Sequence, residues 1–279
     1  MFSSRITAMI TPFDVPQRLF AVQHRFVDLD GGRIHYVDEG AGETLLLLHG
    51  NPSWSFLYRK IIAALKRDFR CVALDFPGYG MSDAPAGYGF TPKEHSDVLE
   101  HFVDRLGLKD LTVMVQDWGG PIGLGLGGRR PGLVRRLIIG NTFAWPLDGE
   151  RRIRVFSWVM GGPIGRALTS AFNFVPKYFF RRGLAERHAP EVLAMYLAPW
   201  RDPARRIAAV TAPRQLVAAS AYLETSQPAQ AGGPAGPDRL GQEGLRVPGR
   251  RARALRATLL ATQDGIAQRR FALPPGRRR

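Results

Sequence analysis

The stretch that most constrains the fold of this chain is residues 111–120, an apolar run that ends abruptly in Asp117, Trp118 and two glycines. A segment able to form a helix follows from Pro121. This order predicts a buried strand, a sharp turn and a helix. The glycines suit a strained turn and a helix that packs close to a strand. Taken alone, the stretch could equally be an ordinary turn in which Asp117 caps the helix.

Other short apolar runs predict further strands that also end in polar residues. The strand ends are His49, Asp75 and Asn141. Helical patterns lie between these runs, over residues 57–65 and from the N-cap Thr91 to a stop at Gly107. Strands alternating with helices predict an α/β fold with a mostly parallel, doubly wound sheet, which binds ligands at the carboxyl ends of its strands.

The sheet is preceded and followed by segments of different character. Residues 24–38 alternate apolar and polar side chains around Gly31-Gly32 and predict an antiparallel hairpin. Residues 147–224 have helical spacing and no strand run, which predicts a helical cap inserted after the sixth strand. We expect the aromatic residues of the cap to form its core and its face toward the sheet, and only a minority to line a pocket: Phe156, Trp158, Phe172, Phe174, Phe179 and Trp200.

The composition excludes several classes of protein. The chain has 279 residues, 45% of them hydrophobic, without an apolar run long enough to cross a membrane. No secretory signal opens the sequence, and the single cysteine, Cys71, lies in an apolar run and is expected to be buried. We therefore expect a cytoplasmic protein with no membrane partner.

The net charge of +15 would suit a nucleic-acid partner, but its distribution argues against one. Residues 237–279 hold eleven Arg and three acids, so most of the excess lies in this tail. We expect the remaining positive charge to be spread over the other residues, with no basic stripe that has aromatic residues between the basic ones. These patterns predict a core over 24–146, a cap over 147–224 and an aberrant Arg/Pro/Gly-rich tail over 225–279, in which the last strands of the sheet are missing.

Three motifs together resemble the haloalkane dehalogenases of the α/β-hydrolase superfamily. They are residues 49–54 (His-Gly-Asn-Pro-Ser-Trp), residues 75–83 (Asp-Phe-Pro-Gly-Tyr-Gly-Met-Ser-Asp) and residues 115–120 (Val-Gln-Asp-Trp-Gly-Gly). The set, in this order and spacing, is more specific than any one motif, and the likeness runs from about residue 24 to about residue 224. It implies an α/β-hydrolase fold with residues 115–120 as the nucleophile elbow.

The resemblance implies Asp117 as the nucleophile, and Asn51 and Trp118 as the halide-binding pair. Displacing halide from a saturated carbon needs a carboxylate in a dry pocket, and a soft leaving anion is stabilised by indole and amide N–H donors. The implied partners are a small halogenated alkane, water and halide, with no cofactor, metal or nucleic acid. Two simpler readings stay open: Trp118 as a core residue and Asn51 as a turn former.

The sequence departs from the family pattern at the residue that should act as the base when the ester is hydrolysed. The family supplies a His and its carboxylate partner after the seventh and eighth strands, whereas no histidine here lies beyond His188, and His49 is better explained as structural. Read one nucleotide out of frame, residues 237–248 permit the series Pro-Ile-Val-Trp-Gly-Lys-Lys-Asp-Phe-Ala-Phe-Arg, which resembles the missing seventh strand. We therefore hypothesise a frameshift between about residues 222 and 237.

Two rival functions fit part of the pattern. Epoxide hydrolases share an Asp-Trp-Gly elbow and use cap tyrosines, for which Tyr178 and Tyr196 are available. Gln116 and Asn51 suit a dehalogenase better. A catalytically dead α/β-hydrolase remnant is the other alternative, since the histidine base is absent.

Overall fold

The computed structural model describes residues 12–183 and 189–225, so the tail and the frameshift hypothesis lie outside the described residues. A six-stranded sheet in the order β1-β2-β4-β3-β5-β6 is the centre of the fold. β4, β3, β5 and β6 run parallel, and β1 and β2 add antiparallel to one edge. The strands are β1 His24–Leu29, β2 Gly32–Glu39, β3 Glu43–Leu48, β4 Phe69–Leu74, β5 Leu111–Asp117 and β6 Val134–Thr142.

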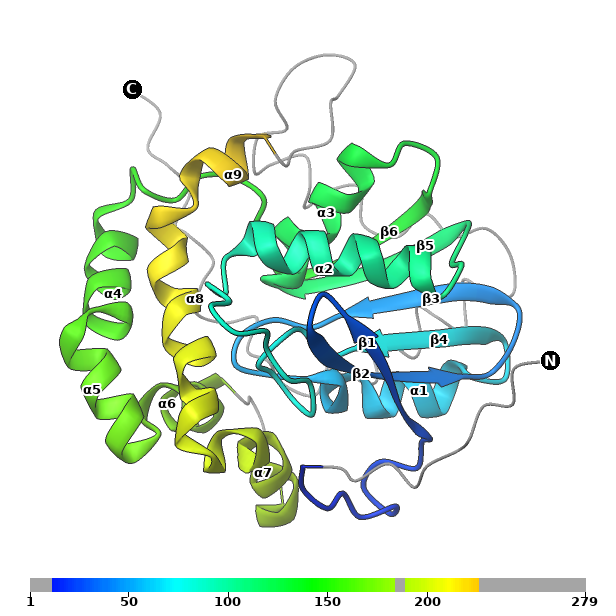
Figure 1. The fold of residues 1–279 in the computed structure, drawn as a ribbon, viewed down its shortest axis with the longest axis horizontal. Helices are drawn as coiled ribbons and strands as arrows, with labels where there is room; N and C mark the ends of the chain where they lie inside the picture. Colours follow the sequence, from blue (N-terminus) through cyan, green and yellow to red (C-terminus); the bar gives the residue numbers. More distant parts are fainter. Residues whose placement is uncertain (1–11, 184–188, 226–279) are drawn as a thin grey trace.

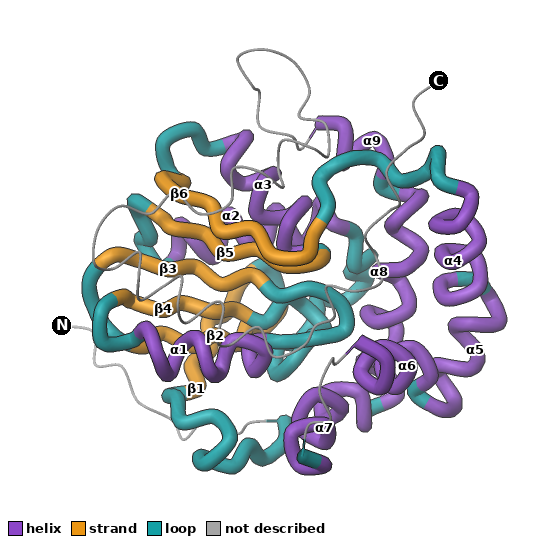
Figure 2. The backbone as a smooth tube through the Cα atoms, turned by 180° about the vertical axis from the view of Figure 1, so that it is seen from behind, coloured by secondary structure: helices purple, strands orange, loops and turns teal. Residues whose placement is uncertain are grey.

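Helices cover both faces of the sheet, as the sequence predicts (Figures 1 and 2). The view from behind in Figure 2 has α1 in front of the sheet, whereas α2 and α3 lie on the other face. The helices of this part are η1 Ser55–Tyr58, α1 Arg59–Leu65, α2 Pro92–Arg105 and α3 Gly119–Arg129. α2 begins with the predicted cap, in which the Thr91 side chain and Glu94 form a capping box.

The core of the sheet confirms the expected buried runs. The side chains of β3 from Leu45 to Leu48 are fully buried, as expected for a strand covered on both faces. Cys71 is fully buried too, and burial raises the pKa of its thiol to about 12, which makes it unreactive. One detail of the hairpin was wrong: its turn lies at Asp30 and Gly31, both with positive φ, and Gly32 already belongs to β2.

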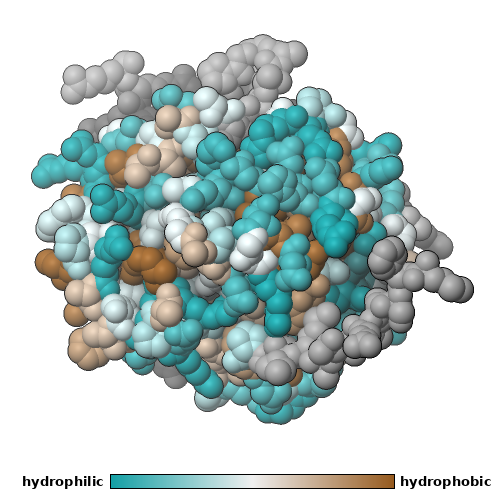
Figure 3. All heavy atoms as spheres, in the orientation of Figure 1, coloured by the Kyte–Doolittle hydropathy of each residue, from teal (hydrophilic) through white to brown (hydrophobic). Residues whose placement is uncertain are grey.

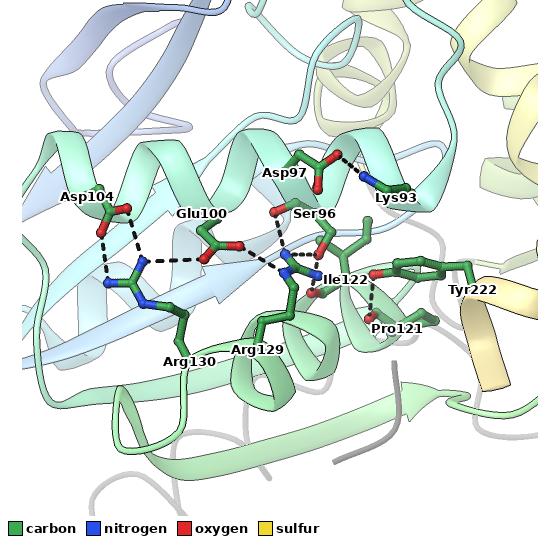
Figure 4. A network of polar contacts seen from close by, with 10 residues as sticks. All are labelled: Lys93, Ser96, Asp97, Glu100, Asp104, Pro121, Ile122, Arg129, Arg130 and Tyr222. Atoms are coloured by element: carbon green, nitrogen blue, oxygen red, sulfur yellow. Dashed lines mark hydrogen bonds and ion pairs between the residues drawn. The ribbon is translucent and has the colours of Figure 1, made fainter. Parts of the chain in front are cut away.

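α3 is held in place by polar contacts, although its six glycines make it an intrinsically weak helix. Figure 4 shows the Arg129 guanidinium beside Glu100, with Nε donating to Oε2 at 2.9 Å, and Arg130 paired with Asp104 at 3.0 Å. Tyr222 reaches α3 from the other end of the described chain. Its hydroxyl donates to the carbonyl of Pro121 at 3.1 Å. These contacts fix the helix that begins beside Asp117.

The cap helices lie between β6 and the end of the described chain, at the end of the sheet toward which its parallel strands point (Figure 1). They are α4 Arg151–Gly161, α5 Pro163–Phe172, α6 Phe174–Gly183, α7 Pro190–Leu197, η2 Ala198–Arg201, η3 Pro203–Arg205, α8 Arg206–Ala218 and α9 Ser220–Thr225. α8 lies between the sheet and α4–α5 in both views. None of the described helices is long and apolar enough to cross a membrane.

The expectation for the cap aromatics was wrong at two positions. Trp200 is fully buried, as expected, but Trp158 and Phe172 are 66% and 67% exposed. Their helices pack on the protein through small residues instead: Gly161 approaches the backbone of Arg214 so closely that a Cβ would lie 2.7 Å from its nitrogen. Helical spacing alone identifies a face of a helix, but not whether that face points inward.

Candidate active site

The backbone is strained at Asp117 itself. Its φ is +50°, a conformation that residues with a side chain rarely adopt, and the pairing of β5 with β6 shifts register between Gln116 and Asp117. The Thr142 hydroxyl, from the end of β6, donates to the Asp117 carbonyl. Strain of this kind persists where the surroundings enforce it, and here it raises the Asp117 side chain above the end of the strand.

The neighbouring glycines provide space rather than positive φ. A Cβ on Gly120 would overlap the Thr142 side chain, and one on Gly50 would overlap the carboxylate of Asp117. Neither glycine has the left-handed backbone conformation. The sequence therefore correctly indicated a strained turn and close packing, but the positive φ lies at Asp117, two residues before the first glycine of the turn.

The carboxylate of Asp117 sits among backbone donors under the cap. The Asn51 backbone N–H donates to its Oδ1 at 2.7 Å, and the Trp118 backbone N–H donates to the same side chain. Burial nevertheless raises the pKa of Asp117 to about 6, because the two hydrogen bonds offset only part of the lost hydration. The group is thus an anion at neutral pH that water solvates poorly, which is the condition of a reactive nucleophile.

A cavity of about 190 Å³ opens beside this carboxylate. Engineered cavities of about 150 Å³ admit benzene, so a small alkyl compound fits. Its walls come from the strand ends and from α4, α6 and α8 of the cap, and most are apolar. The lining residues are Asn51, Asp117, Trp118, Asn141, Thr142, Phe143, Trp145, Leu147, Ile153, Phe156, Phe179, Pro213 and Leu216.

Trp118 presents an indole N–H with no acceptor among the described residues. Two other buried indoles differ: Nε1 of Trp54 donates to the Met195 carbonyl at 3.2 Å, and Nε1 of Trp200 donates to the Pro52 carbonyl at 3.1 Å. The Trp118 ring also packs edge-on against Phe143, with centroids 4.9 Å apart. A buried indole that borders a cavity with its donor unused is suited to binding an anion there.

The side chain of Asn51 is oriented by a proline in the cap. Pro213 lies inside α8 and has no N–H, so the carbonyl of Ala209, four residues earlier, lacks its usual helical partner. Nδ2 of Asn51 donates to this carbonyl at 3.3 Å. Because a carbonyl can only accept, this bond fixes which end of the Asn51 amide is the donor; the Tyr79 hydroxyl lies 3.2 Å from the other end, Oδ1. One amide hydrogen of Asn51 remains for a ligand in the cavity.

Two of the predicted strand-end residues belong to the structural support. Both ring nitrogens of His49 bond to the backbone, Nδ1 to the Gly50 carbonyl at 3.0 Å and Nε2 to the N–H of Phe76 at 3.0 Å. Asp75 is fully buried and accepts from His35 Nδ1 at 2.7 Å. Burial alone would raise the pKa of Asp75, but His35 and backbone donors hold it at about 2. Neither side chain lines the cavity.

No histidine of the described segments lines the cavity at Asp117. Those segments also hold no cluster of three or more potential metal-binding side chains. The tyrosines of the epoxide hydrolase alternative do not line the cavity either. Tyr196 is buried and accepts a hydrogen bond from Arg59 Nη1 at 3.0 Å, and Tyr178 packs against Phe179. Within the described residues, this cavity therefore has no tyrosine pair to polarise an epoxide.

The cap walls of the cavity are what sequence reasoning located least well. Phe156 and Phe179 line it, which agrees with the expectation that a minority of the six cap aromatics face a pocket, but the sequence did not indicate which ones, and Ile153 and Leu216 were not singled out at all. Pro213 carried a usable signal, since a proline inside a helical pattern frees a carbonyl. Which side chain would use that carbonyl could not be read from the sequence.

The chain matches the family model described as alpha/beta hydrolase fold over residues 43–209. It is 41% identical to Haloalkane dehalogenase 2 of Mycobacterium tuberculosis over 215 residues, which cover 77% of this chain and 75% of the relative. It is 36% identical to a cis-3-alkyl-4-alkyloxetan-2-one decarboxylase of Shewanella oneidensis over 194 residues, 68% of this chain and 61% of the relative. The solved structure of the haloalkane dehalogenase DatA from Agrobacterium tumefaciens C58 aligns with a TM-score of 0.68 at 27% identity and covers 74% of each chain.

Proposed function

The chain belongs to the haloalkane dehalogenases of the α/β-hydrolase superfamily, and on this basis we propose that it removes halide from haloalkanes hydrolytically, through an ester on Asp117. The observation that carries the proposal is a poorly hydrated carboxylate beside an apolar cavity whose wall holds the unused indole N–H of Trp118. Cytoplasmic location stays a prediction from the composition.

In the first step, a carboxylate oxygen of Asp117 attacks the halogen-bearing carbon from the side opposite the halogen. A carbon–oxygen bond forms, the carbon–halogen bond breaks, and the halide leaves with the electron pair. The indole N–H of Trp118 and the remaining amide hydrogen of Asn51 stabilise the departing anion. Both donors are already fixed in the free protein, so little reorganisation is needed as charge develops.

In the second step, water attacks the ester carbon, and the backbone N–H groups of Asn51 and Trp118 are placed to hold the resulting oxyanion. The water must lose a proton as it attacks. No histidine lines the cavity within residues 12–183 and 189–225, and no histidine follows His188 in the sequence. We therefore expect this step to be slow and the alkyl ester to accumulate.

Rapid mixing with bromobutane tests both steps. We expect a burst of one bromide per chain, little release afterwards, and one butyl group on Asp117 by mass spectrometry of peptides. A matched Asp117→Asn variant should give neither bromide nor adduct. Sustained release over many turnovers would contradict the stalled ester, because another group would then activate the water. Absence of any burst in folded protein would contradict the first step.

One observation favours a second candidate, decarboxylation of a β-lactone: this reaction needs no base, and no histidine of the described residues lines the cavity at Asp117. Asp117 would attack the saturated ring carbon bonded to the ring oxygen, breaking that carbon–oxygen bond and releasing a carboxylate. Loss of CO₂ would then form the alkene and expel Asp117 unchanged. No water or proton is consumed. The oxetan-2-one specificity named for the Shewanella oneidensis relative supports the choice of substrate.

The two candidates differ in their turnover. With a cis-dialkyl oxetan-2-one, the second candidate is expected to give an alkene over many turnovers, measurable by gas chromatography. The Asp117→Asn variant is the matched control. Alkene formation no faster than in this variant would exclude the second candidate and leave the dehalogenase proposal unaffected.

A further inference from the structure

The outer surface of the cap is apolar. Six large hydrophobic side chains of α4 and α5 are exposed there, and they account for all but one of the exposed large hydrophobic residues in the described segments. They are Val155, Trp158, Val159, Ile164, Leu168 and Phe172. We call this set the cap patch. Figures 1 and 2 place α4 and α5 on the side of the molecule away from the sheet, and brown atoms gather on that side in Figure 3.

The two helices bury their small residues and expose their large apolar ones. In α5, Ile164, Leu168 and Phe172 recur every four residues on the exposed face, whereas Gly165 and Thr169 face the protein. A surface helix of a soluble domain normally has the opposite arrangement. Large apolar side chains exposed together on two helices that contact each other mark a binding surface for another molecule or a membrane.

The cap patch lies in the most basic part of the described chain. Residues 151–183 contain seven basic side chains and no acidic one, all seven are exposed, and none pairs with a carboxylate among the described residues. They are Arg151, Arg152, Arg154, Arg166, Lys177, Arg181 and Arg182. The rest of residues 1–236 carries equal numbers of basic and acidic residues. The expectation of an evenly spread charge without aromatic residues interleaved was therefore wrong.

We propose that the cap patch binds the surface of an anionic lipid bilayer. Its aliphatic and aromatic side chains would enter the boundary between headgroups and acyl chains, with Trp158 at headgroup level, and the arginines would bind lipid phosphates. This binding differs from spanning, on which the expectation of no membrane partner rested. It also does not depend on the reaction proposed for Asp117.

The charge and the apolar area of the cap patch disfavour the other occupants. A second copy joined symmetrically through α4 and α5 would bring two surfaces of the same positive charge together. A nucleic acid would satisfy the arginines and could stack on Trp158, but it would leave Val155, Val159, Ile164 and Leu168 without an apolar contact. A bilayer surface offers anionic headgroups to the arginines and an apolar interior to the hydrophobic side chains.

The docked orientation would bring lipid close to the cavity. α4 has both surfaces: Val155 and Trp158 lie outside, while Ile153 and Phe156 line the cavity beside Asp117. One helix would thus separate the bilayer from the cavity. Apolar compounds concentrate in bilayers, so a chain docked in this way would face its most concentrated supply of small apolar molecules.

Co-sedimentation of the full chain with vesicles tests the proposal. We expect binding to vesicles of equimolar phosphatidylcholine and phosphatidylglycerol, and little binding to phosphatidylcholine alone. The triple variant R152Q/R154Q/R166Q should weaken binding by about fivefold per arginine, since each basic residue near an anionic surface contributes about 1 kcal/mol. The double variant W158S/F172S should weaken it at least tenfold. Brominated lipid should quench Trp158 fluorescence, and this quenching should be absent in Trp158→Phe.

A matched triple variant removes the same charge elsewhere. Arg67, Arg105 and Lys109 are exposed and lie outside the cap, so replacing all three by Gln should leave vesicle binding nearly unchanged. Every variant keeps the arginines of residues 237–279, which makes any attraction through the tail equal in all arms. Equal binding by the cap and control variants would overturn the proposal. Self-association or tRNA binding that W158S/F172S abolishes, without vesicle binding, would overturn it in favour of a second copy or a nucleic acid.

Discussion

Replacing Asp117 by Asn is expected to abolish halide release while making the protein more stable. The amide keeps the size of the side chain but cannot displace halide, so ester formation should fall by at least about 10⁴-fold. The charged carboxylate is destabilising in its buried position, as its pKa of about 6 indicates. Removing the charge should therefore raise the free energy of unfolding at pH 8 by about 1–2 kcal/mol. Bromide release and thermal unfolding of both proteins measure the two effects.

Protonation of Asp117 provides the control for this substitution. The pKa is raised on folding, so the folded state holds the proton more tightly, and stability decreases as pH rises from the unfolded pKa through about 6. The stability difference between Asp117→Asn and the unaltered chain should thus be small near pH 4 and complete above pH 7. The rate of the bromide burst should follow the opposite trend: below pH 6 it should fall tenfold for each unit of pH. A burst that is independent of pH between 5 and 8 would contradict the assignment of Asp117 as nucleophile.

The substitution Trp118→Phe is expected to have the second largest effect. Phenylalanine fills most of the indole volume and can keep the edge-on contact with Phe143, but it removes the N–H that faces the cavity. Losing one fixed donor to developing negative charge lowers rates by about 10²–10³-fold. Stopped-flow measurement of the bromide burst would give the rate directly. Chloride binding, followed by quenching of tryptophan fluorescence, should weaken in parallel.

Trp200→Phe is the matched control for Trp118→Phe. It removes an indole N–H as well, but one that donates to the Pro52 carbonyl at 3.1 Å and does not line the cavity. We expect Trp200→Phe to lower stability, because that carbonyl loses its donor, and to leave chloride affinity unchanged. If both variants lost chloride affinity to the same extent, the role of the Trp118 indole as a halide donor would be refuted.

The fold could be predicted from sequence wherever one pattern decided the outcome. The fully apolar run of β3 and the Thr91–Glu94 cap of α2 are local signals, and the structure confirms both. The outward direction of Trp158 and Phe172 could not be predicted in this way. Periodicity fixes which residues of each helix share a face, whereas the direction of that face depends on what packs on Gly161 in α4 and on Gly165 in α5. That choice is tertiary and leaves no local trace in the sequence.

The same distinction between local and tertiary signals applies to the candidate site. Asp117, Asn51 and Trp118 were named from motifs, and the structure brings all three to the cavity; their catalytic roles stay a prediction. The contact of Asn51 with Ala209 joins residues 158 positions apart and could not be foreseen. A strained turn was expected, but not that the positive φ falls on the carboxylate residue itself, where the pairing of β5 with β6 also shifts register.

The proline in α8 has a consequence for how the product leaves. The Asn51 amide and the Tyr79 hydroxyl both bond to α8, at the carbonyls of Ala209 and Ala208. Any opening of the cap that lifts α8 must break these bonds and release the Asn51 side chain. The hydrogen bond from Asn51 to a bound anion would then weaken in the same movement that opens a path to solvent. Exit of the ion and opening of the cap would be one event, which depends on a proline in the cavity wall that frees the Ala209 carbonyl for Asn51.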